Sequence, residues 1–170
     1  MLEYDPKVSA AIKDVDLSDI EKDSVCMFQL RVSPYFNLFM CFLFPPLISC
    51  YGWNETFING FLIAGCLRYI ITMHATFLVN SAAHLYGSRP YDKKINPAEN
   101  RMVSYFAVGE GWHNWHHKFP FDYAASEYGI WKQYNPTKFF IDTCACIGLV
   151  TERKRASNIW KKMKNNNENQ

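Results

Sequence analysis

Three of the five histidines in this 170-residue chain lie within five consecutive positions, at His113, His116 and His117. In a helix, side chains three and four residues apart share one face, so these imidazoles would point toward a common centre. Neutral imidazole is the commonest nitrogen ligand for iron, zinc and copper, and polar rings gathered on one face need partners. The spacing therefore predicts a metal site, although the motif alone also fits a surface helix or a zinc site.

A second polar cluster precedes these histidines, in the stretch Asn80-Ser81-Ala82-Ala83-His84. Asn80 and His84 are four residues apart, so they share a helix face. The stretch follows directly on a long apolar run that begins near Phe57. A helix starting there rises about 35 Å by Asn80 and about 40 Å by His84, which exceeds a hydrocarbon core of about 30 Å. Both side chains are therefore expected just outside the membrane.

Two apolar segments, residues 35–51 and 57–79, are the elements that must position this chemistry. Their lengths and the short connection between them predict a transmembrane hairpin. The connection carries no lysine or arginine, whereas residues 1–33 carry four and residues 84–170 carry thirteen. By the positive-inside rule, both termini are expected in the cytosol.

Polar and helix-breaking residues interrupt the hairpin at three places. Pro45-Pro46 is expected to kink the first segment, because proline lacks a backbone N–H. Arg68 lies near the middle of the second segment, where a charge is costly, so we expect it to face protein and to find its partner outside this chain. His74 is expected to be a buried, hydrogen-bonded side chain and not a metal ligand.

The composition excludes several classes of protein. A net charge of +2, with no basic run interleaved with aromatic residues, argues against nucleic-acid binding. The six cysteines show no CxxC spacing, which argues against a disulfide framework, and no cleaved signal peptide is recognisable. We divide the chain into a cytosolic juxtamembrane segment (1–33), a transmembrane hairpin (34–83), a cytosolic histidine-box domain (84–152) and a basic, Asn-rich disordered tail (153–170).

Several motifs occur together in a recognisable order: NSAAHLYG at residues 80–87, RPYD at 89–92, NP at 96–97 and GEGWHNWHH at 109–117. This series closely resembles the membrane acyl-CoA desaturases of the stearoyl-CoA Δ9 desaturase family, most like the insect members. The similarity extends from about Asp16 to Lys154, but the two earlier histidine boxes of the family would precede residue 1. The resemblance implies an all-α membrane protein, with this chain as the C-terminal half of a four-helix desaturase.

The resemblance also implies a ligand set. In the family, nine histidines and one water-linked asparagine hold two irons, a di-iron centre. The share of this chain would be His84, His113, His116 and His117, with Asn80 acting through a water molecule. The catalytic residues would be these metal ligands and no others. Thr76 and Phe77 would lie beside the bend of the acyl tunnel, and Phe77 stands where relatives usually carry tryptophan.

The implied reaction uses O2 to introduce a cis double bond, at the Δ9 position, into a saturated fatty acyl-CoA. Cytochrome b5 and NADH-cytochrome b5 reductase would supply electrons, and the protein would cross the endoplasmic reticulum bilayer more than once. Two alternatives stay open: a related lipid hydroxylase, against which NSAAHLYG speaks, and a non-catalytic membrane partner of full-length desaturases. We expect the chain alone to be inactive, because five histidine ligands lie outside it.

Overall fold

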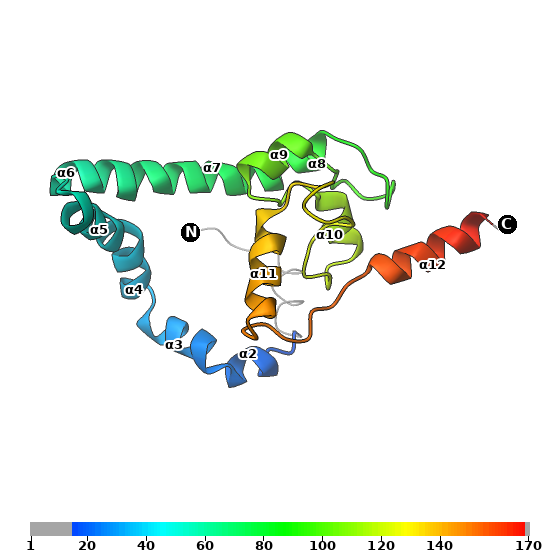
Figure 1. The fold of residues 1–170 in the computed structure, drawn as a ribbon, viewed down its shortest axis with the longest axis horizontal. Helices are drawn as coiled ribbons and strands as arrows, with labels where there is room; N and C mark the ends of the chain where they lie inside the picture. The colour runs from blue at the N-terminus through cyan, green and yellow to red at the C-terminus, as the bar shows by residue number, and fades with distance from the viewer. Residues whose placement is uncertain (1–14, 169–170) are drawn as a thin grey trace. The chain divides into compact units, whose positions relative to one another are not determined.

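A computed structural model of the chain describes residues 15–168, whose regular structure is helical (Figure 1). No strand occurs among these residues, although isolated backbone bridges pair Glu99 with Ser88 and with Trp112. The elements are α2 (Ser18–Lys22), α3 (Ser24–Val32), α4 (Tyr35–Leu38), the π-helix η1 (Phe39–Leu43), α5 (Phe44–Trp53), α6 (Phe57–Gly60), the π-helix η2 (Phe61–Leu67), α7 (Arg68–Asn80), α8 (Ala82–Leu85), α9 (Arg101–Phe106), α10 (His113–Lys118), α11 (Pro136–Cys146) and α12 (Ser157–Glu168). The predicted all-α class is confirmed.

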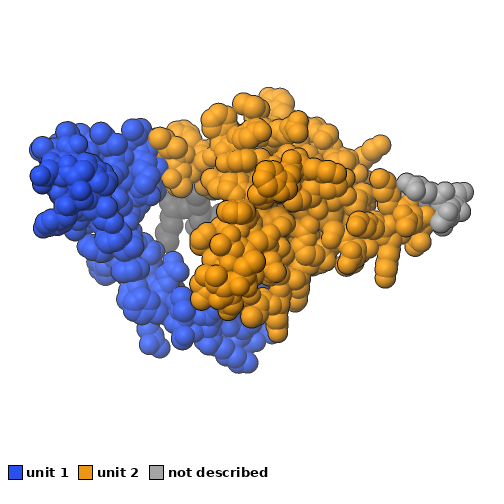
Figure 2. All heavy atoms as spheres, viewed as in Figure 1, with its two compact units in different colours: residues 1–69 blue, residues 70–170 orange. Residues whose placement is uncertain are grey.

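Two helical runs are long and apolar enough to cross a membrane, Tyr35–Trp53 and Phe57–Leu85. Their mean hydropathy is 1.3 and 1.6, and only 11% of each apolar window is buried in the chain itself. Most of their large side chains are therefore exposed, which is the pattern expected of a surface that lipid covers. The chain divides into two compact units, one ending at Tyr69 and one beginning at Ile70 (Figure 2).

The turn between the two runs is built from local polar contacts. Asn54 ends α5 in the left-handed conformation, with φ of 59°, which asparagine tolerates better than most residues. Thr56 begins α6, because its side-chain oxygen accepts from the amide of Asn59. The chain then passes Gly60, where an added Cβ would collide with Ser49 and press on the backbone of Pro46. The two helices of the hairpin thus pack closely at this point.

The pair Pro45-Pro46 explains why the first helical run contains the π-helix η1 and where Arg68 lies. In an α-helix the carbonyl of Cys41 would accept from residue 45, and in a π-helix from residue 46, but both are prolines without an N–H. Arg68 fills the gap, because its Nη2 lies 2.6 Å from the Cys41 carbonyl oxygen while its Nε donates to the Ala64 carbonyl at 2.8 Å. The expectation that the partner of Arg68 lies outside this chain is therefore wrong.

The second unit is organised by buried polar residues as much as by apolar ones. A small apolar cluster joins Ala83, Val103 and Ala107, and a second joins Trp115, Phe119 and Ala156. Around them, fully or almost fully buried polar side chains make hydrogen bonds to distant segments: Ser104, Asn114, Asp122, Ser126, Gln133 and Asn135. Such contacts fix loops that have no regular secondary structure.

The C-terminal segment corrects the predicted tail. Where residues 153–170 were expected to be disordered, Ala156 is fully buried and α12 follows it. Trp160 packs edge-on against Tyr91 and Trp115, with ring centroids 5.3 and 6.4 Å apart, and Asp122 accepts from the amide of Ala156. The packing of one half-buried aromatic side chain, Trp160, outweighs the Asn-rich composition around it. The first fourteen residues of the juxtamembrane segment and the last two of the tail lie outside the described residues.

Candidate metal centre

The helix α10 carries three histidines and is held by the two residues between them. Asn114 is fully buried, and its amide group contacts the backbone of Tyr91, Asp92 and Pro97. Trp115 is fully buried as well, and its indole N–H donates to Asp122 at 3.2 Å. These two anchors determine how α10 is rotated about its axis, and thereby where its histidines point.

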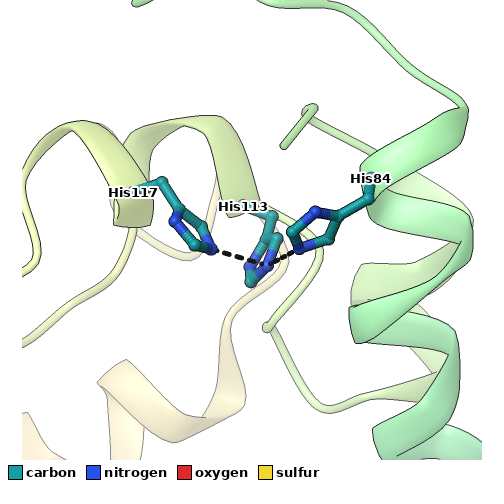
Figure 3. A group of neighbouring side chains, drawn as sticks. All are labelled: His84, His113 and His117. Carbon is teal, nitrogen blue, oxygen red and sulfur yellow. Dashed lines mark hydrogen bonds between the residues drawn. The ribbon is translucent and has the colours of Figure 1, made fainter. Parts of the chain in front are cut away.

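Three imidazoles converge from two helices (Figure 3). His113 and His117 extend from α10 and His84 from α8, and their rings point toward one another. The Nε2 atom of His113 lies 3.0 Å from Nε2 of His84 and 3.1 Å from Nε2 of His117. Ligand atoms of the three residues all lie within 4.8 Å of one another. We call this set the three-histidine group.

The environment of the group lowers the pKa of two of its imidazoles, those of His113 and His117. Burial, followed by the neighbouring His117, His84 and His116, lowers the pKa of His113 to about 4. Burial and the other imidazoles also lower the pKa of His117. Neutral rings retain a lone pair, and the lone pair is what a metal ion binds. The lowered pKa values of His113 and His117 therefore favour the form of these two rings that binds a metal.

The donor atoms fit a transition metal. Nitrogen ligands at about 2.1 Å from one ion lie about 3.0 Å apart in adjacent octahedral positions and about 3.4 Å apart in a tetrahedron. The two short Nε2 distances from His113 are hydrogen-bond distances between imidazoles, and they equal the spacing of adjacent octahedral ligands. The other ring nitrogen of His113, Nδ1, points away from these donor atoms and is buried with no hydrogen-bond partner among the described residues. A nitrogen-only donor set of this kind suits iron, zinc or copper and does not suit magnesium or calcium.

The structure separates His116 from the other predicted ligands. Its ring stacks on that of His113, with centroids 5.7 Å apart and planes inclined by 27°, but it is not part of the three-histidine group. Along a helix, His116 lies about 60° to one side of His113 and His117 about 40° to the other. His84 approaches on the side of His117. His116 therefore faces a different direction.

The remaining predicted site residues lie on α7. Asn80 donates its side-chain amide to the carbonyl of Thr76 at 3.2 Å and is not one of the grouped ligands. Thr76 and Asn80 line a mostly apolar groove of about 370 Å³, together with Ala107 and Val108. Phe77 lies outside this groove, 54% exposed.

His74 lies away from the metal site. Its ring contacts that of Phe77 edge to face, with centroids 6.4 Å apart. It is not a member of the three-histidine group. It is exposed in this chain, and its burial within the complete helix bundle stays a prediction.

Sequence reasoning missed Glu99, which contacts α10 from outside. Its Oε1 atom accepts from the backbone amide of Trp115 at 2.9 Å. Burial raises the pKa of this carboxyl to about 7, while hydrogen bonds from the amides of Trp115 and Asn114 act in the opposite direction. No local pattern marks this half-buried glutamate, because its partner Trp115 is sixteen residues away.

Comparison with known proteins identifies the group to which this chain is related. No protein-family profile matches it. Among curated proteins, it is 51% identical to acyl-CoA desaturase 3 of Mus musculus and 52% identical to stearoyl-CoA desaturase of Homo sapiens, each over 152 residues, which is 89% of this chain and 42% of the relative. Stearoyl-CoA desaturase 5 of Bos taurus is 47% identical over 145 residues, 85% of this chain and 43% of the relative.

The chain belongs to the stearoyl-CoA desaturase family. It spans about 42% of the length of the curated relatives that it matches. Membership of this acyl-CoA desaturase family implies iron, and the three-histidine group offers donor atoms of the right kind. The residues present therefore fit the metal that the desaturase family implies.

Proposed function

We propose that this chain forms part of an acyl-CoA desaturase that introduces a cis double bond, at the Δ9 position, into a saturated fatty acyl-CoA. The convergence of His84, His113 and His117 in a chain about 51% identical to curated desaturases is the observation that carries the proposal. The balanced reaction takes one acyl-CoA, one O2, two electrons and two protons to the unsaturated acyl-CoA and two waters. Of the two named alternatives, a hydroxylase would insert an oxygen atom and leave no double bond.

The ligands divide between two irons in this proposal. His84, His113 and His117 would hold one iron, and His116, which faces a different direction, would belong to the second. Asn80 acts through a water molecule, and the other five histidines come from the two earlier boxes. When bound, the iron pair supplies the O2 chemistry that removes hydrogen from an unactivated methylene, which no side chain can do.

The residues of the chain hold the centre and help to place the acyl chain. Burial of His113 keeps its imidazole neutral and limits the access of water to the donor atoms. Thr76 lies on the groove of α7, where it would contact the substrate beside the bend of the acyl tunnel. Phe77 would contact the same bend from outside the groove, and its ring offers no N–H, in contrast to the tryptophan usual in relatives.

The proposed setting is the endoplasmic reticulum membrane, with both termini cytosolic and electrons delivered by cytochrome b5 and its NADH-dependent reductase. The absence of lysine and arginine from residues 52–56 supports this topology. In intact microsomes, added protease should remove a tag from the C-terminus. A protected tag would reverse the assigned orientation.

Complementation of a yeast strain that requires unsaturated fatty acid tests the activity. Residues 1–170 alone should not support growth, because at most one iron could be held, in an incomplete shell. The same chain joined in frame after the preceding part of human stearoyl-CoA desaturase should support growth and yield a Δ9 product by mass spectrometry. Growth from residues 1–170 alone would refute the expected inactivity. An expressed, membrane-inserted fusion that fails to grow would refute the desaturase proposal.

A further inference from the structure

The two helices that carry the three-histidine group do not continue into one another, so something else must determine the distance between them. His84 lies in α8, and the next ligand follows twenty-nine residues later in α10. Between them the segment Ala98-Glu99 contacts both helices. The amide of Ala98 donates to the carbonyl of Ala83, beside His84, at 2.7 Å.

The other contact of this segment reaches α10. The Oε1 atom of Glu99 accepts from the amide of Trp115, which lies between His113 and His117 in sequence. The backbone of Glu99 is itself fixed, because it exchanges two hydrogen bonds with Ser88, at 2.7 and 3.2 Å. Its second carboxylate oxygen, Oε2, lies 3.4 Å from the side-chain amide nitrogen of the buried Gln133.

From this arrangement we infer that Glu99 is a positioning residue of the metal centre, whose side chain sets the spacing between His84 on α8 and His113 and His117 on α10. It touches none of the three ligands in the described contacts and acts through Trp115. The inference rests on the proposed function, since it gives Glu99 a role toward the metal that the group would hold. Residues that orient ligands in this way typically contribute 10- to 100-fold in metal affinity.

The cost of burying the carboxyl supports a dedicated role. Burial raises the pKa of Glu99 to about 7, so the native state keeps a carboxyl where its charge is disfavoured. An apolar residue at this position would avoid that cost but would leave the amide of Trp115 without its acceptor. What Glu99 provides is therefore the hydrogen bond to α10.

The test titrates Co²⁺, used as a spectroscopic probe, into the full chain of residues 1–170 in detergent, with the absorption bands of the bound ion as readout. Glu99→Ala should weaken binding about 10- to 100-fold and change the band positions, whereas Glu99→Gln, which keeps an acceptor oxygen, should bind within about threefold of the unmutated chain. Asp142→Ala is the matched control. It removes a carboxylate that contacts Tyr123, Lys138 and Arg153 and nothing on α10.

Hydrogen exchange of the α10 amides, measured without metal, distinguishes a failure of the proposed metal site from a failure of the positioning role of Glu99. Faster exchange in Glu99→Ala than in Asp142→Ala is expected. Equal Co²⁺ affinity in Glu99→Ala and the unmutated chain, or an equal loss in Asp142→Ala, would overturn the role of Glu99. If the unmutated chain binds no Co²⁺, the metal site in this chain is refuted, and exchange alone decides whether Glu99 positions α10.

Discussion

The two units of the chain bury different kinds of residue. In the unit that ends at Tyr69, the buried residues of the hairpin helices are small: Pro46, Ser49, Gly60 and Gly65. In the unit that begins at Ile70, Asn114, Trp115 and Asp122 are buried and joined to distant segments by hydrogen bonds. The first unit thus leaves its apolar side chains to its surroundings, while the second determines its own geometry.

This difference shows where the precision of the site comes from. A lipid-facing hairpin needs length, hydropathy and a close contact between helices, and many sequences meet these requirements. A group of imidazoles within 4.8 Å of one another needs particular partners at particular positions. We therefore expect single substitutions to have larger effects in the second unit.

The largest effect should follow the loss of a grouped histidine. His84→Ala, His113→Ala and His117→Ala should each lower the Co²⁺ or Fe²⁺ affinity of the chain by more than about 100-fold, beyond the usual cost of losing a supporting residue. His116→Ala and His74→Ala should bind within about threefold, because neither ring belongs to the group. Isothermal titration would measure this, and a loss in His116→Ala as large as in His113→Ala would place His116 on the same ion.

Part of this site is predictable from the sequence and part is not. The spacing of His113 and His117 predicts a shared helix face, and the length of the apolar run places His84 near a membrane surface. Whether His116 joins them depends on the rotation of α10, which the distant partners of Asn114 and Trp115 determine. No local pattern contains that information.

The same limit applies to the elements that were misjudged. Local composition predicts disorder at the C-terminus, but Trp160 finds a partner in Trp115, forty-five residues away. Arg68 is recognisable as an unusual charge in an apolar helix. Its partner is the Cys41 carbonyl, which lacks a backbone donor because of the two prolines on the other helix. Contacts between segments decide both outcomes.

The next largest effect concerns two glycines at close contacts, one in each unit. At Gly111 a Cβ would collide with the backbone of Asn100 and Ser104, which cannot move aside, so Gly111→Ala should cost about 3 kcal/mol. At Gly60 the nearest atom belongs to the side chain of Ser49, so Gly60→Ala should cost about 1 to 2 kcal/mol. Gly129→Ala and Gly52→Ala, with open space around each glycine, are the matched controls. Thermal unfolding in detergent tests the order, and a larger loss at Gly60 would contradict it.

A smaller effect should appear in the pH dependence of stability without metal. Burial lowers the pKa of His113 from 6.5 to about 4, so between these values the unfolded chain binds a proton that the native chain does not. The free energy of unfolding therefore rises with pH in this range. Burial raises the pKa of Glu99 from 4.5 to about 7, so the native chain binds the extra proton there and the free energy of unfolding falls with pH.

The contributions of His113 and Glu99 have opposite signs between about pH 4.5 and 6.5, and the lowered pKa of His117 adds to the contribution of His113. Glu99→Gln should reveal the histidine contribution, a rise of up to about 1.4 kcal/mol per pH unit, and His113→Asn should reveal the opposite slope. Unfolding midpoints at pH 5, 6 and 7 would separate the three chains. If the midpoints of the three chains changed with pH in the same way, neither Glu99 nor His113 would be as buried as the structure places it.

The smallest effect is expected at Arg68, in the first unit. Pro45 and Pro46 remove both backbone donors that could serve the Cys41 carbonyl, and Arg68 replaces them from the facing helix at 2.6 Å. Interhelical hydrogen bonds in membrane proteins contribute only about 0.6 to 1.7 kcal/mol, because the separated helices also find partners. Arg68→Leu should therefore lower the SDS concentration that unfolds the hairpin by a modest amount, and Arg68→Lys by less. Arg31→Leu, at an exposed arginine of α3, removes the same charge and should have no effect. An equal shift in Arg31→Leu would assign the effect to net charge. The hydrogen bond from Arg68 to the Cys41 carbonyl would then contribute nothing measurable to stability.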